Sequence, residues 1–209
     1  MPKCKICKEP FVKIRPIQPT CKSYDCMVAF AKNVAEKAIV KKKKAQTKVL
    51  KEKTTNWKNK LQTKVQEIAR LIDKGLPCLS KGTDKCQLQG GHVFAKGREK
   101  QMRFNLHNIH RQSAQSNKWE NDDVNFRKGI INEYGQQYFD FIENLKQTPQ
   151  PKHAEIEYME FYQSACKIAN ELKKLGKTYL LQQRIELRNK INLEIGIYQE
   201  QYCIYVQQP

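Results

Sequence analysis

Apolar residues recur every three or four positions along much of this chain, which is the interval that gathers side chains on one face of a helix. The first such segment runs from Met27 to Gly75 and predicts one long helix or two. Its last turns alone carry an apolar face, formed by Leu61, Val65, Ile68, Leu71 and Ile72. We therefore expect these last turns to pack on a core and the preceding turns to be largely exposed to solvent.

Two more segments, residues 126–146 and 155–175, have the same amphipathic pattern. Gly135 lies inside the first of them and predicts a break, because glycine has a low helix propensity. The tail of residues 179–206 mixes helix-forming and β-branched residues, and we predict helix there only to about Glu194. The chain is therefore expected to be mainly α-helical.

A strand-like pattern interrupts the helices after the first helical segment. Short extended runs at Cys78–Ser80 and Cys86–Phe94 predict the two strands of a β-hairpin. His92 lies near the end of the second run and follows Gly90 and Gly91. Two glycines allow unusual backbone angles or the close approach of a phosphate. A small α+β core within a helical protein follows from this pattern.

The charge of the chain changes this picture by indicating a partner. Its 209 residues include 39 Lys and Arg but only 21 Asp and Glu, a formal net charge of +18. Such a balance suits a polyanion such as nucleic acid, although it is also typical of generally basic soluble proteins. The charge is clustered, which favours nucleic acid. The segment Met27–Gly75 holds fourteen Lys and Arg against four Asp and Glu.

The basic residues concentrate in a helical arm and near His92. The arm is either an ordinary solvated helix or a surface that follows phosphates without reading sequence, and we favour the second interpretation. A basic loop follows His92, and two further cations are placed to hold phosphate oxygens. The candidate DNA contacts are Lys41, Lys42, Lys43, Lys44, Lys96, Arg98, Lys100, Arg103 and Lys118.

The apolar content gives no sign of a membrane protein. Hydrophobic residues make up 39% of the chain, the mean hydropathy is −0.77, and no stretch approaches the roughly 20 apolar residues of a membrane span. The first ten residues, MPKCKICKEP, lack the apolar core of a signal peptide. We therefore expect a cytoplasmic protein with reduced thiols, in which eight cysteines indicate metal binding rather than disulfides.

Four of these cysteines form two closely spaced pairs near the N-terminus. Cys4, Cys7, Cys21 and Cys26 follow the pattern C-x2-C-x13-C-x4-C. Four thiolates can close a tetrahedral zinc site, and the metal replaces a core that so short a segment cannot build. Free thiols or a redox pair are the alternatives. The paired spacing favours structural Zn²⁺.

A second candidate site surrounds His92. Hydrolysis of a phosphodiester needs a base for water and a cation beside the phosphate. His92 is the candidate base, Asn108 could fix the hairpin or the His ring, and Asn117 offers an oxygen to Mg²⁺ or Mn²⁺. His107 and His110 are alternatives for these roles. A histidine in a polar loop is, however, more often an ordinary surface residue.

In its order of motifs the chain resembles the NinG (Rap) recombination proteins of lambdoid phages and prophages, over nearly its whole length. The matching residues are Leu76-Pro77-Cys78, Gly91-His92, Arg103-Phe104-Asn105, Asn108-Ile109-His110, Gln112, Asn117 and Arg127-Lys128-Gly129-Ile130. The ordered set is specific, whereas any one piece alone is weak.

The resemblance implies a ββα-metal (HNH) core and a nuclease that acts on branched DNA in phage recombination with a divalent metal. On the family pattern His92 is the general base and Asn108 the central Asn. Asn117 takes the last position, where many HNH nucleases have His. The location implied is the cytoplasm of a bacterial host, and branched substrates with two-fold symmetry are compatible with a homodimer.

Several residues depart from the family pattern. The family brackets its core with two zinc-binding C-x2-C pairs, of which only Cys78 is present here. Gln89 stands where the family has an aspartate, and residues 118–123 differ from the segment that follows the last Asn. The alternative to an active endonuclease is therefore a DNA-binding recombination accessory protein with weak or no cleavage. A third hypothesis for the function is a basic RNA-binding protein without cleavage activity.

These observations predict four regions. Residues 1–27 form a Cys4 zinc knuckle, and residues 28–75 form a Lys-rich helical arm. Residues 76–147 form an HNH-like nuclease core. The linker Thr148-Pro149-Gln150-Pro151 leads to a C-terminal helical region at residues 152–209.

Overall fold

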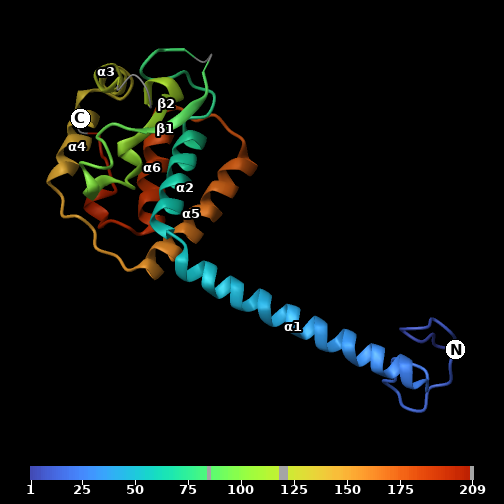
Figure 1. Ribbon diagram of the computed structural model, residues 1–209. Helices are drawn as coiled ribbons and strands as arrows, with labels where there is room; N and C mark the ends of the chain where they lie inside the picture. The colour runs from blue at the N-terminus through green and yellow to red at the C-terminus, as the bar shows by residue number, and fades with distance from the viewer. Residues whose placement is uncertain (84–85, 118–121, 208–209) are drawn as a thin grey trace. The chain divides into compact units, whose positions relative to one another are not determined.

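The computed structural model describes residues 1–83, 86–117 and 122–207. It is mainly helical, as the apolar spacing predicts, and contains a two-stranded sheet (Figure 1). The chain divides into two units, Met1–Thr55 and Asn56–Pro209. This division falls inside the predicted basic arm, which forms two helices and not one. Within the described residues no helix is both long enough and apolar enough to cross a membrane.

The first unit has a very small core. Cys4, Phe11 and Cys26 are buried together, and an isolated bridge between Lys3 and Pro10 closes the first turn. Helix α1 follows at Tyr24–Thr54 and contains neither proline nor glycine. The side chains of residues 31–44 are all exposed, including those of Val34, Ile39 and Val40. Residues 31–44 are therefore held in the helix by backbone hydrogen bonds and helix propensity, without side-chain burial.

The second unit is built on the contact between α2 and α5. Helix α2 spans Trp57–Ile72, and its N-cap Asn56 accepts a hydrogen bond from the backbone of Asn59. Helix α5 spans Glu155–Leu175 and ends at Gly176 in the left-handed region. The buried residues of α2 are Leu61, Gln62, Val65, Ile68, Ala69 and Ile72. The predicted apolar face thus packs on a helix about 100 residues later in the chain.

The sheet corrects the predicted hairpin. Strand β1 is Leu88–His92 and its antiparallel partner β2 is Ile109–Ser113, with His92 opposite Ile109. Cys78–Ser80 is not a strand. It belongs to a turn in which Gly82 N donates to Cys78 O. All five residues of β2 are buried although most are polar, so the alternation that marks a half-buried strand is absent.

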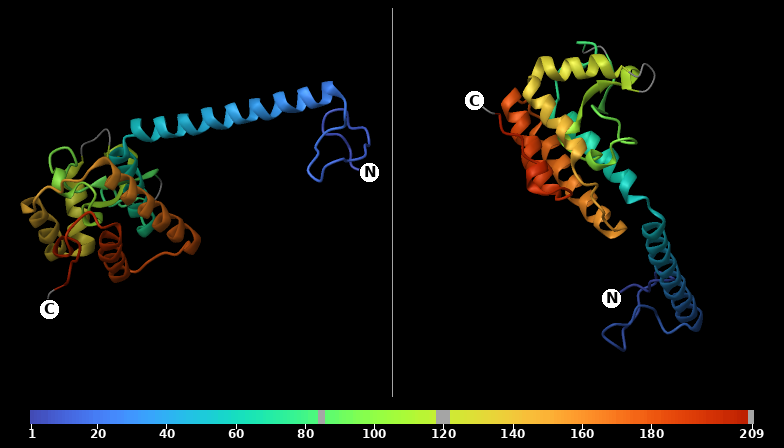
Figure 2. Two further views of the ribbon diagram at one scale, coloured as in Figure 1. Left: turned by 90° about the horizontal axis from the view of Figure 1, so that it is seen from below. Right: turned by 90° about the vertical axis from the view of Figure 1, so that its left-hand side faces the viewer.

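A second group of helices meets the hairpin at His110, whose ring packs edge-on against those of Tyr134 and Tyr138. Helix α3 (Asp123–Tyr134) and helix α4 (Gln136–Asn144) are separated by Gly135, whose φ of 87° ends the first helix as predicted. Helix α6 (Leu181–Ile195) ends one residue beyond the predicted limit. The segment after α6 returns to α4 (Figure 2). There the ring of Tyr205 packs edge-on against that of Tyr138.

A buried ion network ties these elements together. Asp73, just after α2, accepts hydrogen bonds of 2.9 Å at both carboxylate oxygens from Arg188 of α6. The same carboxylate accepts the backbone N–H of Arg111 in β2. The Arg111 guanidinium pairs with Glu133 of α3. Arg188 also lies 3.1 Å from His110 Nδ1, so α2, α3, α6 and β2 share one set of polar contacts.

Candidate functional site

The candidate site is organised by the order strand, loop, strand and helical turn. His92 ends β1, Asn108 directly precedes β2, and Asn117 lies in the helical turn that follows β2. Strand β1 lies against α2, where Gln66 Nε2 donates to Gly90 O at 2.7 Å. A Cβ on Gly90 would stand 2.8 Å from Gln66 O. The close approach of α2 therefore requires a glycine at this position, a reason that was not among the two that the sequence suggested, unusual backbone angles and the approach of a phosphate.

Asn108 fixes the loop between the two strands. Its Oδ1 accepts from Phe94 N at 2.8 Å and its Nδ2 donates to Phe94 O at 3.0 Å. A longer contact of 3.4 Å joins Nδ2 to Met102 O. Both polar atoms of this buried amide are hydrogen-bonded to backbone groups. Asn108 can therefore position the loop that carries the site, but it has no free atom for a substrate or a cation.

The His92 ring is held by the Arg103 carbonyl, and the Gln62 amide nitrogen, which can only donate, lies beside the same ring nitrogen. Its Nε2 lies 3.0 Å from Arg103 O and 3.2 Å from Gln62 Nε2. A carbonyl can only accept, so the Arg103 contact favours the tautomer with the proton on Nε2 and leaves Nδ1 as the basic nitrogen. Burial, opposed by the Arg103 carbonyl and aided by the charge of Lys96, lowers the pKa of His92 to about 4. The ring is consequently neutral at pH 7, and it is a weaker base than an ordinary imidazole.

Helix α2 also positions the side chain of Arg103. Arg103 Nε donates to Gln62 Oε1 at 2.9 Å, and its Nη2 donates to Asn59 Oδ1 at 3.1 Å. The guanidinium lies 5.4 Å from the centre of the Phe104 ring. Gln62 thus contacts both His92 and Arg103 from a helix about 30 residues earlier. The sequence offered only a faint signal for it, an amide placed beside Leu61 on an otherwise apolar face.

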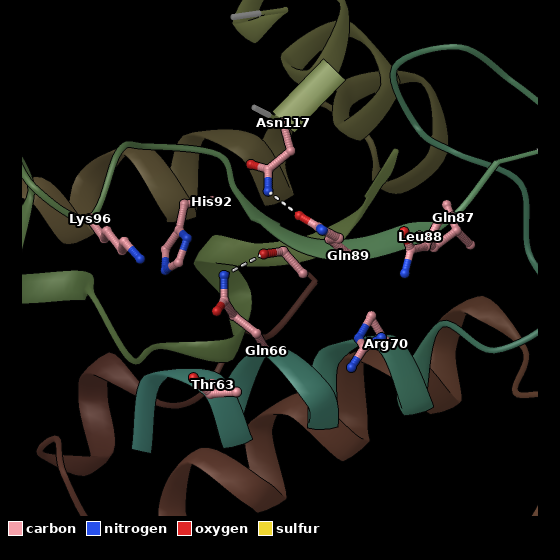
Figure 3. Close-up of a pocket in the computed structure, with 10 residues that line it drawn as sticks. Thr63, Gln66, Arg70, Gln87, Leu88, Gln89, His92, Lys96 and Asn117 are labelled. Atoms are coloured by element: carbon pink, nitrogen blue, oxygen red, sulfur yellow. Dashed lines mark hydrogen bonds between the residues drawn. The ribbon is translucent and has the colours of Figure 1, made fainter. Parts of the chain in front are cut away.

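His92 and Asn117 line one pocket of about 490 Å³, with the α2 residues Thr63, Gln66 and Arg70 across from them (Figure 3). Asn117 Nδ2 donates to Gln89 Oε1 at 3.1 Å. Its Oδ1 therefore remains on the side of His92 (Figure 3).

The predicted cations are only partly gathered at this pocket. Lys96 lines it, and Arg98 and Lys100 are exposed on the loop that follows. Lys118 lies outside the described residues. Lys41–Lys44 belong to the first unit, where their side chains are exposed. Arg70, which the sequence reasoning missed, is an additional cation at the pocket.

The pocket offers few ligands for a metal ion. Its described lining contains no carboxylate, and Asn117 supplies an amide oxygen. Asp122 and Asp123 are not among the lining residues. They lie at the start of α3, where Asp122 Oδ1 accepts from Asn125. A cation held by Asn117 would therefore complete its coordination with water and phosphate oxygens, as Mg²⁺ commonly does.

His107 and His110, the alternatives for the catalytic roles, lie in the core instead. His107 Nδ1 is 2.9 Å from the Tyr138 hydroxyl, and its Nε2 is 3.0 Å from Cys203 O. Burial lowers the pKa of His107 to about 3 and that of His110 well below its ordinary value. Both rings are fully buried and have partners at their nitrogens. Neither can reach a substrate.

Hydrogen bonds join the turn at residues 78–82 to the end of β2. Cys78 Sγ accepts from Ser113 N at 3.1 Å, and Gln112 Nε2 donates to Ser80 Oγ at 3.2 Å. Ser113 Oγ in turn accepts from Ser116 N at 3.0 Å. Direct contacts therefore hold the turn at residues 78–82 against the end of β2.

The N-terminal cysteines form a cluster suited to a metal such as zinc. The sulfur atoms of Cys4, Cys7, Cys21 and Cys26 all lie within 4.8 Å of one another, and those of Cys7 and Cys21 are 3.9 Å apart. Zn–S bonds of about 2.3 Å in a tetrahedron imply sulfur separations of about 3.8 Å. Burial of Cys4 is outweighed by backbone N–H groups that lower its pKa to about 6, whereas burial and the neighbouring thiols raise the pKa of Cys26 to about 12.

We expect the purified chain to contain about one zinc ion, which elemental analysis of the protein would measure. The double variant Cys4→Ser, Cys26→Ser should lose it, because two sulfurs hold zinc poorly. Cys166→Ser, a change on α5, should keep it. Equal zinc in the wild type and the double variant would contradict the assignment.

The comparisons with known proteins place the chain in a phage protein family. The family model described as "Bacteriophage Lambda NinG protein" matches residues 1–175. The chain therefore belongs to the NinG family, as the motif order indicated. It is 34% identical over 90 residues to the ninG proteins of Escherichia phage lambda, Enterobacteria phage H19B and Escherichia phage 933W.

These 90 residues cover 42% of this chain and 44–45% of each relative. The match thus spans less than half the length of these relatives. No solved structure matches the chain.

Proposed function

We propose that this protein is a metal-dependent endonuclease that cleaves branched DNA during phage or prophage recombination, in the cytoplasm of the bacterial host. One observation carries the proposal. A neutral histidine, held at Nε2 by the Arg103 carbonyl, lines the same pocket as the Asn117 amide oxygen. The strand, loop, strand and helical turn that carry these residues follow the order of an HNH nuclease.

In this mechanism His92 Nδ1 removes a proton from water. The water oxygen attacks phosphorus, and the bond to the leaving sugar oxygen breaks. Lys96 and Arg70, which line the pocket, would face the negative phosphate oxygens. Arg103, held by Gln62 and Asn59, adds positive charge beside His92 but is not among the lining residues. Mg²⁺ or Mn²⁺ beside Asn117 would stabilise the charge that develops on the phosphate and the leaving oxygen.

DNA binding in this proposal rests on charge. Lys41–Lys44 are consecutive and exposed on α1, and Arg98 and Lys100 are exposed near the pocket. Contacts of this kind neutralise phosphates without reading base sequence. They suit a protein that selects DNA by its branched shape. A homodimer is compatible with a junction of two-fold symmetry.

The second candidate function is a DNA-binding recombination accessory protein that does not cleave. The lack of a carboxylate among the described residues of the pocket favours it, since a tightly held catalytic cation usually has at least one.

One experiment separates the two functions. A four-way DNA junction and a linear duplex of the same sequence are incubated with the full chain and Mg²⁺ or Mn²⁺, with EDTA as the metal-free control. We expect the junction to be cleaved with metal and to remain intact with EDTA. Asn117→Ala should raise the metal concentration needed, whereas Asn125→Ala, an exposed amide outside the pocket, should not. Tight junction binding without cleavage in either metal would favour the accessory protein, and preference for an RNA junction would contradict both.

A further inference from the structure

The first unit presents an exposed apolar surface that its own core does not use. Ile17 is 93% exposed, Val12 73% and Ile14 66%. Ile14 and Ile17, together with Met27 from the beginning of α1, line a hollow of about 700 Å³. Scattered apolar side chains are normal on a protein surface, but a group that lines a hollow of this size is typical of a binding site.

The loop that carries these side chains is fixed by Gln18. Its Oε1 accepts from Ile14 N at 2.9 Å, and its Nε2 donates to Thr20 O at 2.9 Å. Gln18 N also donates to Arg15 O. Three bonds from one residue therefore hold the loop in the shape that turns Ile14 and Ile17 outward. A loop held in this way loses little conformational freedom when a ligand binds.

The charged side chains that line the hollow have one sign. Among the residues that the structure describes, Arg15 and Lys22 are the charged ones in its lining, and the exposed Asp25 is close in sequence but does not line it. A second copy of the chain would bring like charges together, which opposes self-association through this face. Nucleic acid would neutralise the cations but would leave Ile14 and Ile17 without an apolar partner.

We propose that this hollow, defined by Ile14, Arg15, Ile17, Lys22 and Met27, docks a segment of a partner protein that is both acidic and apolar. Leucine, isoleucine or phenylalanine side chains of that segment fill the hollow, and flanking Asp or Glu residues pair with Arg15 and Lys22. Such a surface would bring the protein to a protein partner and is independent of the chemistry at His92.

The test selects peptides from a random library displayed on phage, with the full chain as bait. Selected peptides are synthesised, and their affinity is measured by fluorescence anisotropy. We expect them to combine Asp or Glu with large apolar residues and to bind more weakly as salt is raised. The double variant Ile14→Ser, Ile17→Ser should bind them about tenfold more weakly or worse. Leu180→Ser, an equally exposed change in the second unit, should not alter the affinity.

Unchanged zinc content in the double variant shows that the knuckle remains folded. Selection of the same peptides by the double variant, or of basic or purely apolar ones by the wild type, would overturn the proposal. The proposal would also be overturned if a short DNA duplex displaced the bound peptide to the same extent from the wild type and from Leu180→Ser. A dimer in analytical ultracentrifugation that dissociates in the double variant would instead assign the face to a second copy.

Discussion

Replacing Asp73 by alanine is expected to destabilise the second unit by about 3–5 kcal/mol, the usual cost of removing one partner from a buried ion pair. The Asp73 carboxylate accepts two bonds from Arg188, which has no exposed surface, and one from the backbone of Arg111. Burial opposes the charge of Arg188, but Asp73 more than compensates and raises the pKa of Arg188 above its ordinary range. Without Asp73 a buried guanidinium stays charged and loses its main anion.

Urea unfolding of the full chain, followed by circular dichroism, measures this loss. Glu171→Ala is the matched control, because Glu171 is exposed on α5 and its removal should change stability by no more than about 0.5 kcal/mol. The double variant Asp73→Ala, Arg188→Met should recover part of the stability, since it removes the unpaired charge as well. Equal unfolding midpoints for Asp73→Ala and Glu171→Ala would show that the network contributes little.

The same network explains which parts of the fold the sequence could predict. Helices α2 and α5 have strong apolar spacing, and α5 has the predicted bounds, whereas for α2 the sequence predicted the apolar face but not the start of the helix at Trp57. Strand β2 was missed because His110, Arg111 and Gln112 look like a polar loop. Their partners come from distant segments: Arg188 for His110, Asp73 and Glu133 for Arg111, and Ser80 for Gln112. Periodicity within a strand carries no information about such partners, so the hairpin was assigned to the wrong neighbour.

The residues of the candidate site, like the elements of the fold, could be predicted from the sequence only in part. His92 and Asn117 were identified by residue type and order, and the structure brings them to one pocket. The contacts of Gln62 with His92 and Arg103 depend on how α2 lies against the loop after β1. Nothing in the spacing of the chain fixes that arrangement. His107 and His110 show the converse case, since their residue type suggested chemistry and their burial gives them a structural role.

If the nuclease proposal holds, His92→Ala should lower the rate of junction cleavage by about 10²–10⁴-fold, the usual contribution of a general base. Binding of the junction should change little, because phosphate contacts come mainly from Lys and Arg. His153→Gln is the control, since that ring contacts Glu157 and Ile197 O, away from the pocket. Single-turnover cleavage in Mg²⁺ measures the rate, and equal rates in His92→Ala and the wild type would remove His92 from the mechanism.

The pH dependence of cleavage tests the role of Gln62 as a positioning residue. Because the pKa of His92 is lowered to about 4, its neutral form predominates above that pH, and the rate should fall only when the pH drops through that region. Gln62→Glu keeps an oxygen that accepts from Arg103 Nε. It also places a carboxylate where Gln62 Nε2 now lies 3.2 Å from His92 Nε2. A nearby anion favours the imidazolium, so the pKa of His92 should rise and the loss of activity should begin at a higher pH.

NMR titration of the His92 ring would show the same shift without relying on activity. If Gln62→Glu leaves the pKa of the His92 ring unchanged, the amide does not control the protonation of His92. If the pKa rises but the protein still fails to cleave, Gln62 controls the ring and the proposed hydrolysis is not supported.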